Sequence, residues 1–184
     1  MANSITGKIF VLDTVGIVST KPVWVKKIVL YPNAAADAAV LNYWNPEALI
    51  AAGCSTTLGT AYTGTITSTT TLTASGGTLL PSTITSGSVF ELTESTGTTA
   101  NLNRPVLVTT AGNNTVVVSS DAAWTNEATK QYTWKTYQNY LAFKLLAPAT
   151  EKMIYQMDFA NPFRVPNLIL NSVSSSAVVH IYIA

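Results

Sequence analysis

The chain has 184 residues, of which 47% are hydrophobic and only 10% are charged, whereas an average soluble domain carries about 25% charged residues. Its net charge of +1 lacks the strong basic footprint of a protein that binds nucleic acid or anionic lipid. One cysteine, Cys54, and one histidine, His180, exclude an internal disulfide and the usual kinds of zinc site. We expect part of so weakly charged a surface to lie against other protein.

The first 52 residues are apolar and aromatic. Residues 8–12 (KIFVL) and 23–31 (VWVKKIVLY) are rich in Val, Ile and aromatic residues and lie between turn residues, which predicts two strands. Residues 33–39 and 46–52 are too short to form stable helices alone, so we interpret them as connections or strand flanks.

The middle of the chain is dominated by threonine and serine, which make up 29 of the 66 residues from 55 to 120. Such a composition also occurs in flexible linkers. However, threonine outnumbers serine, and apolar clusters recur at residues 89–90, 106–108 and 116–118 with glycine or Asn-Asn turn signals between them. These features predict a compact β-domain of short antiparallel strands.

Apolar and aromatic character returns near the end of the chain. Four more strands are predicted, at residues 140–146, 152–159, 166–171 and 177–183. In the last of them Ala177, Val179, Ile181 and Ile183 form one face, while Val178, His180 and Tyr182 form the other, because successive strand residues point to opposite sides.

The simplest architecture for this order of strands is an all-β fold. We predict a base domain that resembles a β-sandwich or jelly-roll and is formed by residues 1–54 and 130–184. Residues 55–129 are predicted to form a small Thr/Ser-rich β-domain inserted between the two halves. Cys54, at the predicted boundary, is interpreted as a small buried residue.

The sequence is short of the residues that catalysis requires. His180 lies in a strand pattern rather than on a loop, and the carboxylates are dispersed without the spacing of a metal-binding loop. Lys21, Lys26 and Lys27 form a small basic cluster that is typical of a protected strand edge. We therefore predict no catalytic residues, no cofactor and no metal site.

Aromatic residues point instead to contacts with other protein, because Trp and Tyr are favoured in interfaces as well as in cores. A histidine and a tyrosine among apolar residues suit a partly hydrated interface better than a dry core. We therefore predict partner contacts at Val178, His180, Tyr182 and Trp24.

Several segments resemble small β-rich virion proteins of tailed bacteriophages. They are the opening (MANSITGKIFVLDT), the segment VWVKKIVLYPNAAADAAVL and the ending PFRVPNLILNSVSSSAVVHIYIA. The order of residues 87–92, Asn101, Asn103, 106–109, 115–119 and 126–128 also resembles a small β-module of phage structural proteins. Ser88 stands where that module usually has an acidic residue, and Arg104-Pro105 replaces its Gly-x-Tyr turn.

The resemblance implies a structural protein of the virion. Its expected role is that of a capsid decoration or cement protein on the capsid exterior, made in the host cytoplasm, which binds the major capsid protein or other virion proteins and stabilises the shell. We expect a homo-oligomer or many copies on a symmetric lattice, with neither nucleic acid nor membrane as a partner. A neck, tail or fibre component and a carbohydrate-binding or adhesion module are the alternatives.

Overall fold

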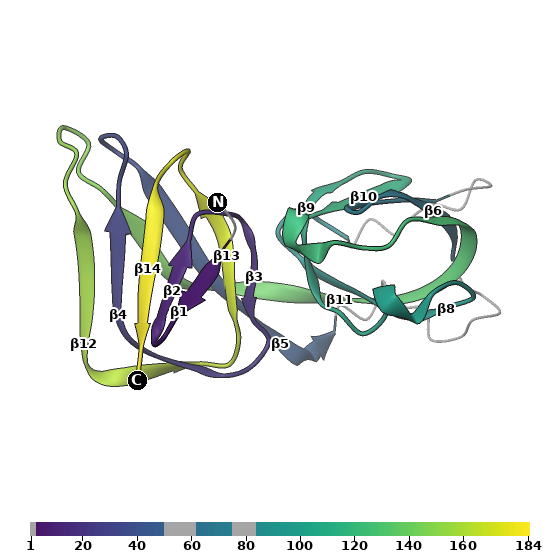
Figure 1. Ribbon diagram of the computed structural model, residues 1–184, viewed down its shortest axis with the longest axis horizontal. Coiled ribbons are helices and arrows are strands. Elements are labelled where there is room, and N and C mark those ends of the chain that lie inside the picture. The colour runs from purple at the N-terminus through teal and green to yellow at the C-terminus, as the bar shows by residue number, and fades with distance from the viewer. Residues whose placement is uncertain (1–2, 50–61, 75–83) are drawn as a thin grey trace. The chain divides into compact units, whose positions relative to one another are not determined.

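The protein forms two compact units built from β-strands (Figure 1). The structure is a computed structural model, and it describes residues 3–49, 62–74 and 84–184. One unit comprises Met1–Tyr43 with Tyr140–Ala184, and the other comprises Trp44–Asn139. Within the described residues, two 3₁₀ turns, η3 (Thr99–Asn101) and η4 (Ser120–Ala122), are the only helical elements. The predicted all-β fold class is confirmed.

The first unit contains a five-stranded antiparallel sheet. Its order is β1-β2-β14-β4-β12, so the C-terminal strand lies in the middle of the sheet (Figure 1). The strands are β1 (Ser4–Thr6), β2 (Ile9–Leu12), β14 (Val178–Ile183), β4 (Val23–Tyr31) and β12 (Tyr155–Val165).

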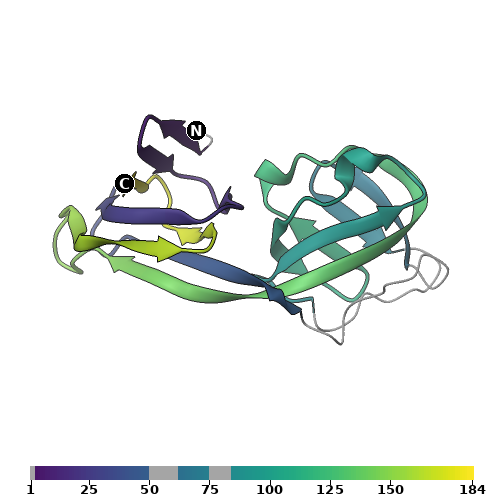
Figure 2. The ribbon, with the colours of Figure 1, turned by 90° about the horizontal axis from the view of Figure 1, so that it is seen from below.

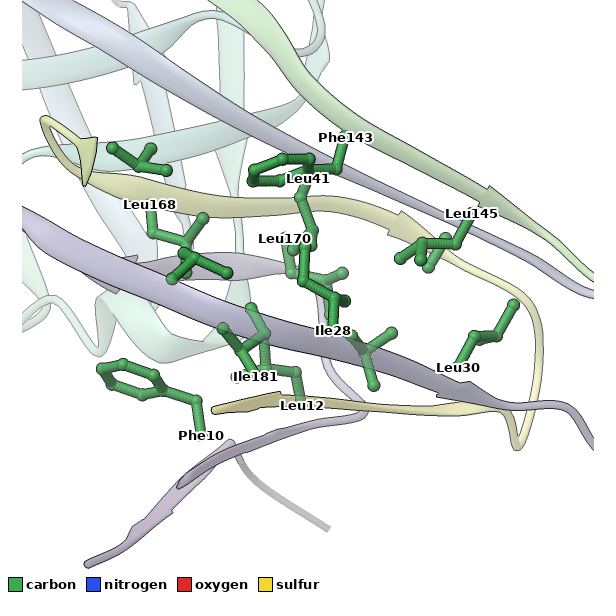
Figure 3. Packing of buried hydrophobic residues seen from close by; sticks show 14 of the residues in the cluster. Phe10, Leu12, Ile28, Leu30, Leu41, Phe143, Leu145, Leu168, Leu170 and Ile181 are labelled. Atoms are coloured by element: carbon green, nitrogen blue, oxygen red, sulfur yellow. The ribbon is translucent and has the colours of Figure 1, made fainter. Parts of the chain in front are cut away.

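A second sheet faces the first across a hydrophobic core. In this unit its order is β3-β13-β5-β11, with β3 (Gly16–Ser19), β13 (Leu168–Val173), β5 (Ala38–Leu49) and β11 (Glu127–Leu146). Each fully buried aliphatic side chain contributes about 1.5–3 kcal/mol relative to exposure. The side chains that Figure 3 labels in this core are Phe10, Leu12, Ile28, Leu30, Leu41, Phe143, Leu145, Leu168, Leu170 and Ile181.

In the described residues, the second unit contains a closed ring of six antiparallel strands. Five of them follow the order β6-β7-β10-β9-β8, with β6 (Tyr62–Ser68), β7 (Thr71–Ala74), β10 (Thr115–Val118), β9 (Val106–Ala111) and β8 (Val89–Ser95). Strand β11 pairs with both ends of this series, because Tyr132 is in register with Tyr62 of β6 and with Ser95 of β8. Closure removes the free sheet edges that promote aggregation (Figure 2).

Aromatic side chains fill the interior of this ring. The Phe90 ring lies 5.8 Å from that of Trp134 and 6.2 Å from that of Trp124, measured between ring centroids. Both tryptophans and Tyr132 are almost fully buried, together with aliphatic residues from the other strands. Threonine-rich strands therefore form a packed core because alternate positions carry Val, Ile, Leu or an aromatic residue.

The boundaries of the two compact units differ from the domain boundaries predicted from the composition of the sequence. Composition placed the inserted domain at residues 55–129, whereas the second compact unit runs over Trp44–Asn139. Strands β5 and β11 each extend across a boundary between the two units. The chain therefore passes from one unit to the other within a strand, at a different residue from the change in composition. Pro46, in the segment that the sequence predicts to be a connection or a strand flank, lies within β5.

We expect Ile181→Ala to destabilise the first unit by about 2–5 kcal/mol, because Ile181 is fully buried and the substitution leaves a cavity. Ile5→Ala removes the same atoms from a side chain that is 63% exposed and should change stability by less than about 0.5 kcal/mol. Urea denaturation of both variants measures the difference. Equal losses would contradict the assigned core.

We also expect the first unit to fold when Trp44–Asn139 is replaced by a flexible linker of about six residues. The ends to be joined are close, since the rings of Tyr43 and Tyr140 stack with centroids 5.5 Å apart. A cooperative thermal transition and a strand-type circular dichroism spectrum would support this expectation. An insoluble or unfolded product would show that the two ends of the chain do not fold alone.

Candidate functional site

The candidate site begins with the alternation of side chains along β14. Val179 and Ile181 are fully buried in the core, while Val178, His180 and Tyr182 are half-buried on the opposite side. Because β14 lies between β2 and β4, its neighbours supply the rest of this surface. We refer to the side of β2, β14, β4 and β12 that faces away from the core as the outer face.

The strand register determines which side chains meet on the outer face. On the β4 side, Val178 lies opposite Tyr31, His180 opposite Val29 and Tyr182 opposite Lys27. On the β2 side, His180 lies opposite Val11 and Tyr182 opposite Ile9. Residues from three segments far apart in the sequence therefore form one continuous surface.

His180 sits between two tyrosines in this surface. Its ring centroid lies 4.6 Å from that of Tyr31 and 6.5 Å from that of Tyr182. The Lys27 ammonium lies 5.4 Å from the centroid of the Tyr182 ring, a cation–π contact that contributes about 0.5–1 kcal/mol. These contacts hold the four side chains in a defined row.

Two groups of this row, His180 and Tyr31, have pKa values shifted toward their neutral forms. Burial lowers the pKa of His180, so its imidazole is uncharged at neutral pH. A hydrogen bond with Tyr182, followed by burial, raises the pKa of the Tyr31 phenol. The centre of the outer face thus presents the uncharged imidazole of His180 beside the phenol of Tyr31, groups that donate and accept hydrogen bonds.

Trp24 lies on the same face, close to the end of β14. Its side chain is 51% exposed, and its backbone carbonyl accepts a hydrogen bond of 3.0 Å from the N–H of Ala184. In the register of β12 with β4, Arg164 is the cross-strand neighbour of Trp24. The structure therefore brings all four predicted contact residues onto one surface, and their role in binding stays a prediction.

Five further residues of this surface are not predicted as contacts from the sequence: Ile9, Val11, Lys27, Val29 and Tyr31. Lys27 had been interpreted only as part of a polar strand edge. Alternation along residues 23–31 predicts which side chains face outward at the start of the strand. A shift between Lys26 and Ile28 then changes which side chains face inward, so the pattern does not extend to the end of the strand. Only the register of β4 against β14 shows that they adjoin His180 and Tyr182.

The Asn-Ala-Ala-Ala-Asp segment of the phage resemblance forms a tight turn between β4 and β5. The Asp37 carboxylate accepts hydrogen bonds from the backbone N–H groups of Asn33 (2.6 Å) and Ala34 (2.8 Å). These backbone bonds lower the pKa of Asp37, with a further contribution from the Ser174 hydroxyl. Ala36 has a φ of 60°, in the left-handed region. The chemistry of this turn is thus structural: the Asp37 carboxylate satisfies backbone donors.

Two polar side chains of the second unit, Asn101 and Glu127, also satisfy backbone hydrogen-bonding groups. The buried Asn101 amide donates to the Thr125 carbonyl at 2.9 Å and accepts from the Thr125 N–H at 2.7 Å, which mimics a strand pair. The Glu127 carboxylate accepts from the Tyr132 hydroxyl at 2.8 Å and from the N–H of Thr98. Burial, then the bond to Glu127, raises the pKa of Tyr132.

Gly97 is required beside this carboxylate for steric reasons. A Cβ atom at position 97 would collide with the Glu127 side chain, which Thr98 and Tyr132 hold in place. The Asn101 and Glu127 groups therefore organise loops of the second unit, and their hydrogen-bonding capacity is used within the protein.

Neither a metal-binding cluster nor a membrane-spanning helix occurs in the part of the chain that the structure describes. Within residues 3–49, 62–74 and 84–184, no three His, Cys, Asp or Glu side chains gather in a way that would hold a metal ion. In the same residues, no helix has the length and apolar character needed to cross a membrane. Cys54 lies outside the described residues.

Comparison of the sequence with known proteins adds no relative. No protein-family model matches the chain, and no curated protein matches it in sequence.

Because the pKa of His180 is lowered on folding, the folded protein binds fewer protons there than the unfolded chain. We expect the contribution of this group to stability to be complete above about pH 6.5, the ordinary value for histidine, and to decline as the pH falls below it. In thermal melts from pH 7.5 to 5, wild type should lose more stability than His180→Gln. Parallel curves for the two proteins would contradict burial of the imidazole.

Proposed function

We propose that the protein is a structural component of a tailed-phage virion, and specifically a capsid decoration or cement protein that binds the major capsid shell and stabilises it. The observation that carries the proposal is the outer face, where Tyr31, His180, Tyr182 and Trp24 lie together on one sheet. The resemblance of the first and last segments of the chain to phage virion proteins supplies the class of partner.

The composition of the outer face suits contact with another protein. Tyrosine and tryptophan combine a large apolar area with a polar group that finds a partner at the edge of an interface. The imidazole of His180 is uncharged and the pKa of the Tyr31 phenol is raised, so a partner can cover these two groups without the large cost of desolvating unpaired charges. Ile9, Val11 and Val178 add aliphatic area around them.

The proposed mechanism is mechanical. The sandwich docks by its outer face across neighbouring capsid subunits and resists their separation. A single site of this size gives modest affinity, but any protein that binds the folded shell and not its dissociated subunits stabilises the shell. Repeated copies on a symmetric lattice add their effects, and copies that bridge two subunits gain from avidity.

The alternatives make different predictions for copy number and ligand. A decoration protein on the capsid exterior should be present in hundreds of copies per particle, in line with its shell symmetry. A neck, tail or fibre component should be present in about a dozen copies or fewer. Quantitative mass spectrometry of purified particles distinguishes the two. A carbohydrate-binding module would instead give specific signals on a glycan array, for which Trp24 is the exposed aromatic side chain of this face.

We expect the double variant His180→Ala with Tyr182→Ala to remain folded and to lose particle binding. Both side chains lie outside the core, so their removal should cost little stability, while the aromatic row of the outer face disappears. Binding is measured by co-sedimentation with particles that lack the protein, and shell stabilisation by the melting temperature of those particles.

A matched control removes apolar area elsewhere. Leu141 and Leu146 of β11 are 61% and 52% exposed, and Leu141→Ala with Leu146→Ala should leave particle binding unchanged. Full binding by the His180/Tyr182 variant, or loss of binding only in the leucine variant, would contradict the assignment of the outer face.

A further inference from the structure

The excess positive charge of the protein is concentrated in the five-stranded sheet. The strands of this sheet carry three cations, Lys26, Lys27 and Arg164, and one anion, Asp158. The whole chain has ten lysines and arginines against nine aspartates and glutamates, so the residues outside these strands carry seven cations and eight anions. The sheet is therefore positive although the rest of the chain is slightly negative.

Arg164 lies on the outer face because its neighbours along β12 face the core. Val165 is buried, and the ring of Phe163 packs on that of Phe143 with centroids 5.6 Å apart. Alternation along the strand places Arg164 on the opposite side, where it is the cross-strand neighbour of Trp24. An exposed guanidinium and a half-exposed indole are therefore adjacent on this surface.

A bulge in β4 adds a second lysine to the outer face. Val25 and Ile28 are both buried in the core, although regular alternation would place residues three positions apart on opposite sides. Lys27 is paired with both β14 and β12, but the next paired residue of β4 is Val25. Lys26 is skipped in both registers and is exposed, as expected for the extra residue of a bulge. Because the core covers the inner side of this strand, the exposed Lys26 lies on the outer side.

The lysines of β4 do not protect a strand edge. The sequence predicts that role for Lys26 and Lys27, because charged residues on an edge strand prevent edge-to-edge association. In the structure β4 lies between β14 and β12, so both of its edges are paired. The prediction is wrong for these two residues, and their place within the sheet requires another explanation.

The three cations have no anionic partner within the described part of the chain. No ion pair joins Lys26, Lys27 or Arg164 to another described residue, and Lys27 instead contacts an aromatic ring. Asp158, which lies opposite Lys27, accepts a hydrogen bond from Gln156. The outer face therefore presents unpaired positive charge beside its aromatic side chains.

We propose that Trp24, Lys26, Lys27 and Arg164, which we call the basic patch, bind an acidic segment of a partner protein. The inference rests on the proposed function, since it assigns the chemistry of the partner surface that the outer face contacts. Carboxylates of the segment pair with the two ammonium groups and the guanidinium, and a guanidinium can bind a carboxylate through two parallel hydrogen bonds. The indole supplies apolar area beside these pairs.

The rest of the outer face favours protein carboxylates over phosphates. Nucleic acids and anionic membranes are bound by extended basic surfaces, whereas this sheet has only three cations with an anion among them. Ile9, Val11 and Val178 continue the same face as aliphatic area, which a phosphate backbone would leave exposed. Apolar and aromatic groups with charges beside them are typical of a protein interface.

Charge reversal tests the basic patch. Lys26→Glu and Arg164→Glu each place an anion against the acidic segment and should weaken binding to particles that lack the protein by about tenfold or more, chiefly through slower association. Wild-type binding should also weaken as the salt concentration rises from about 0.05 to 0.5 M, because salt screens exposed charges. Co-sedimentation measures the affinity and stopped-flow light scattering measures the association rate.

Lys144→Glu is the matched control. Lys144 is an exposed lysine of the same unit on β11, in the other sheet, so its reversal should leave particle binding unchanged. The melting temperature of each variant reports folding. If a reversal prevents folding, Lys26→Gln and Arg164→Gln provide the same comparison, with an expected loss of about two- to fivefold.

An oligo-glutamate peptide of about ten residues probes the patch without particles. It should shift the indole N–H resonance of Trp24 in ¹H–¹⁵N spectra, because the indole lies beside the cations that the peptide binds. Trp24→Phe assigns this resonance. Oligo-glutamine of the same length should leave it in place, and the reversal variants should lose the response to oligo-glutamate.

The outcomes separate this inference from the proposed function. Particle binding that is independent of salt and unchanged in the reversal variants would overturn the basic patch and leave the proposed function in place. A wild-type protein that does not bind particles, but whose Trp24 resonance responds to oligo-glutamate, would contradict only the proposed function. Absence of both responses would overturn both. Tighter binding to a single-stranded DNA oligonucleotide or to phosphatidylserine vesicles than to oligo-glutamate would overturn the assignment of a protein partner.

Discussion

Backbone pairing along β11 is the constraint on which most of the structure depends. This single strand of 20 residues, Glu127–Leu146, pairs with β6 and with β8, and it also adjoins β5 in the sheet order. Buried N–H and C=O groups must find partners, so a strand of this length needs neighbours along its whole extent. Pairing with β6 and β8 closes the ring of the second unit, and its last residues contribute Phe143 and Leu145 to the core of the first.

Alternation along the strands then separates a core from a usable surface. In β14, Val179 and Ile181 are buried in the core of the sandwich. Because side chains alternate along a strand, Val178, His180 and Tyr182 lie on the outer face. The neighbouring strands provide Tyr31 and Lys27 at defined distances from His180 and Tyr182. A central strand is well suited to this role, because its outer side chains are supported on both sides and present a rigid surface to a partner.

The low charge of the chain has opposite consequences at different surfaces. At the centre of the outer face, neutral imidazole and phenol groups offer hydrogen bonds at little desolvation cost. Within the second unit, the Glu127 carboxylate accepts a hydrogen bond from the Tyr132 hydroxyl, and the Asn101 amide is hydrogen-bonded to the backbone of Thr125. Both groups therefore stabilise the fold.

The sequence by itself determined the class of fold and the faces of single strands. Runs rich in Val, Ile and aromatic residues between turn residues predicted strands at residues 8–12, 23–31 and 177–183, and the alternation in the last of them separated Ile181 from His180. Such patterns are local, since they depend on how one strand meets a core. Turn residues and side-chain type were therefore sufficient to predict these strands.

Only the tertiary structure decided which strands are neighbours and where the units divide. The closure of the ring through Tyr132, the meeting of Tyr31 with His180, and the continuation of β5 through Pro46 all depend on register between segments far apart in the chain. Register is set by the sum of many weak contacts across two strands, so no single segment encodes it. Composition could therefore not show that β5 and β11 belong to both units.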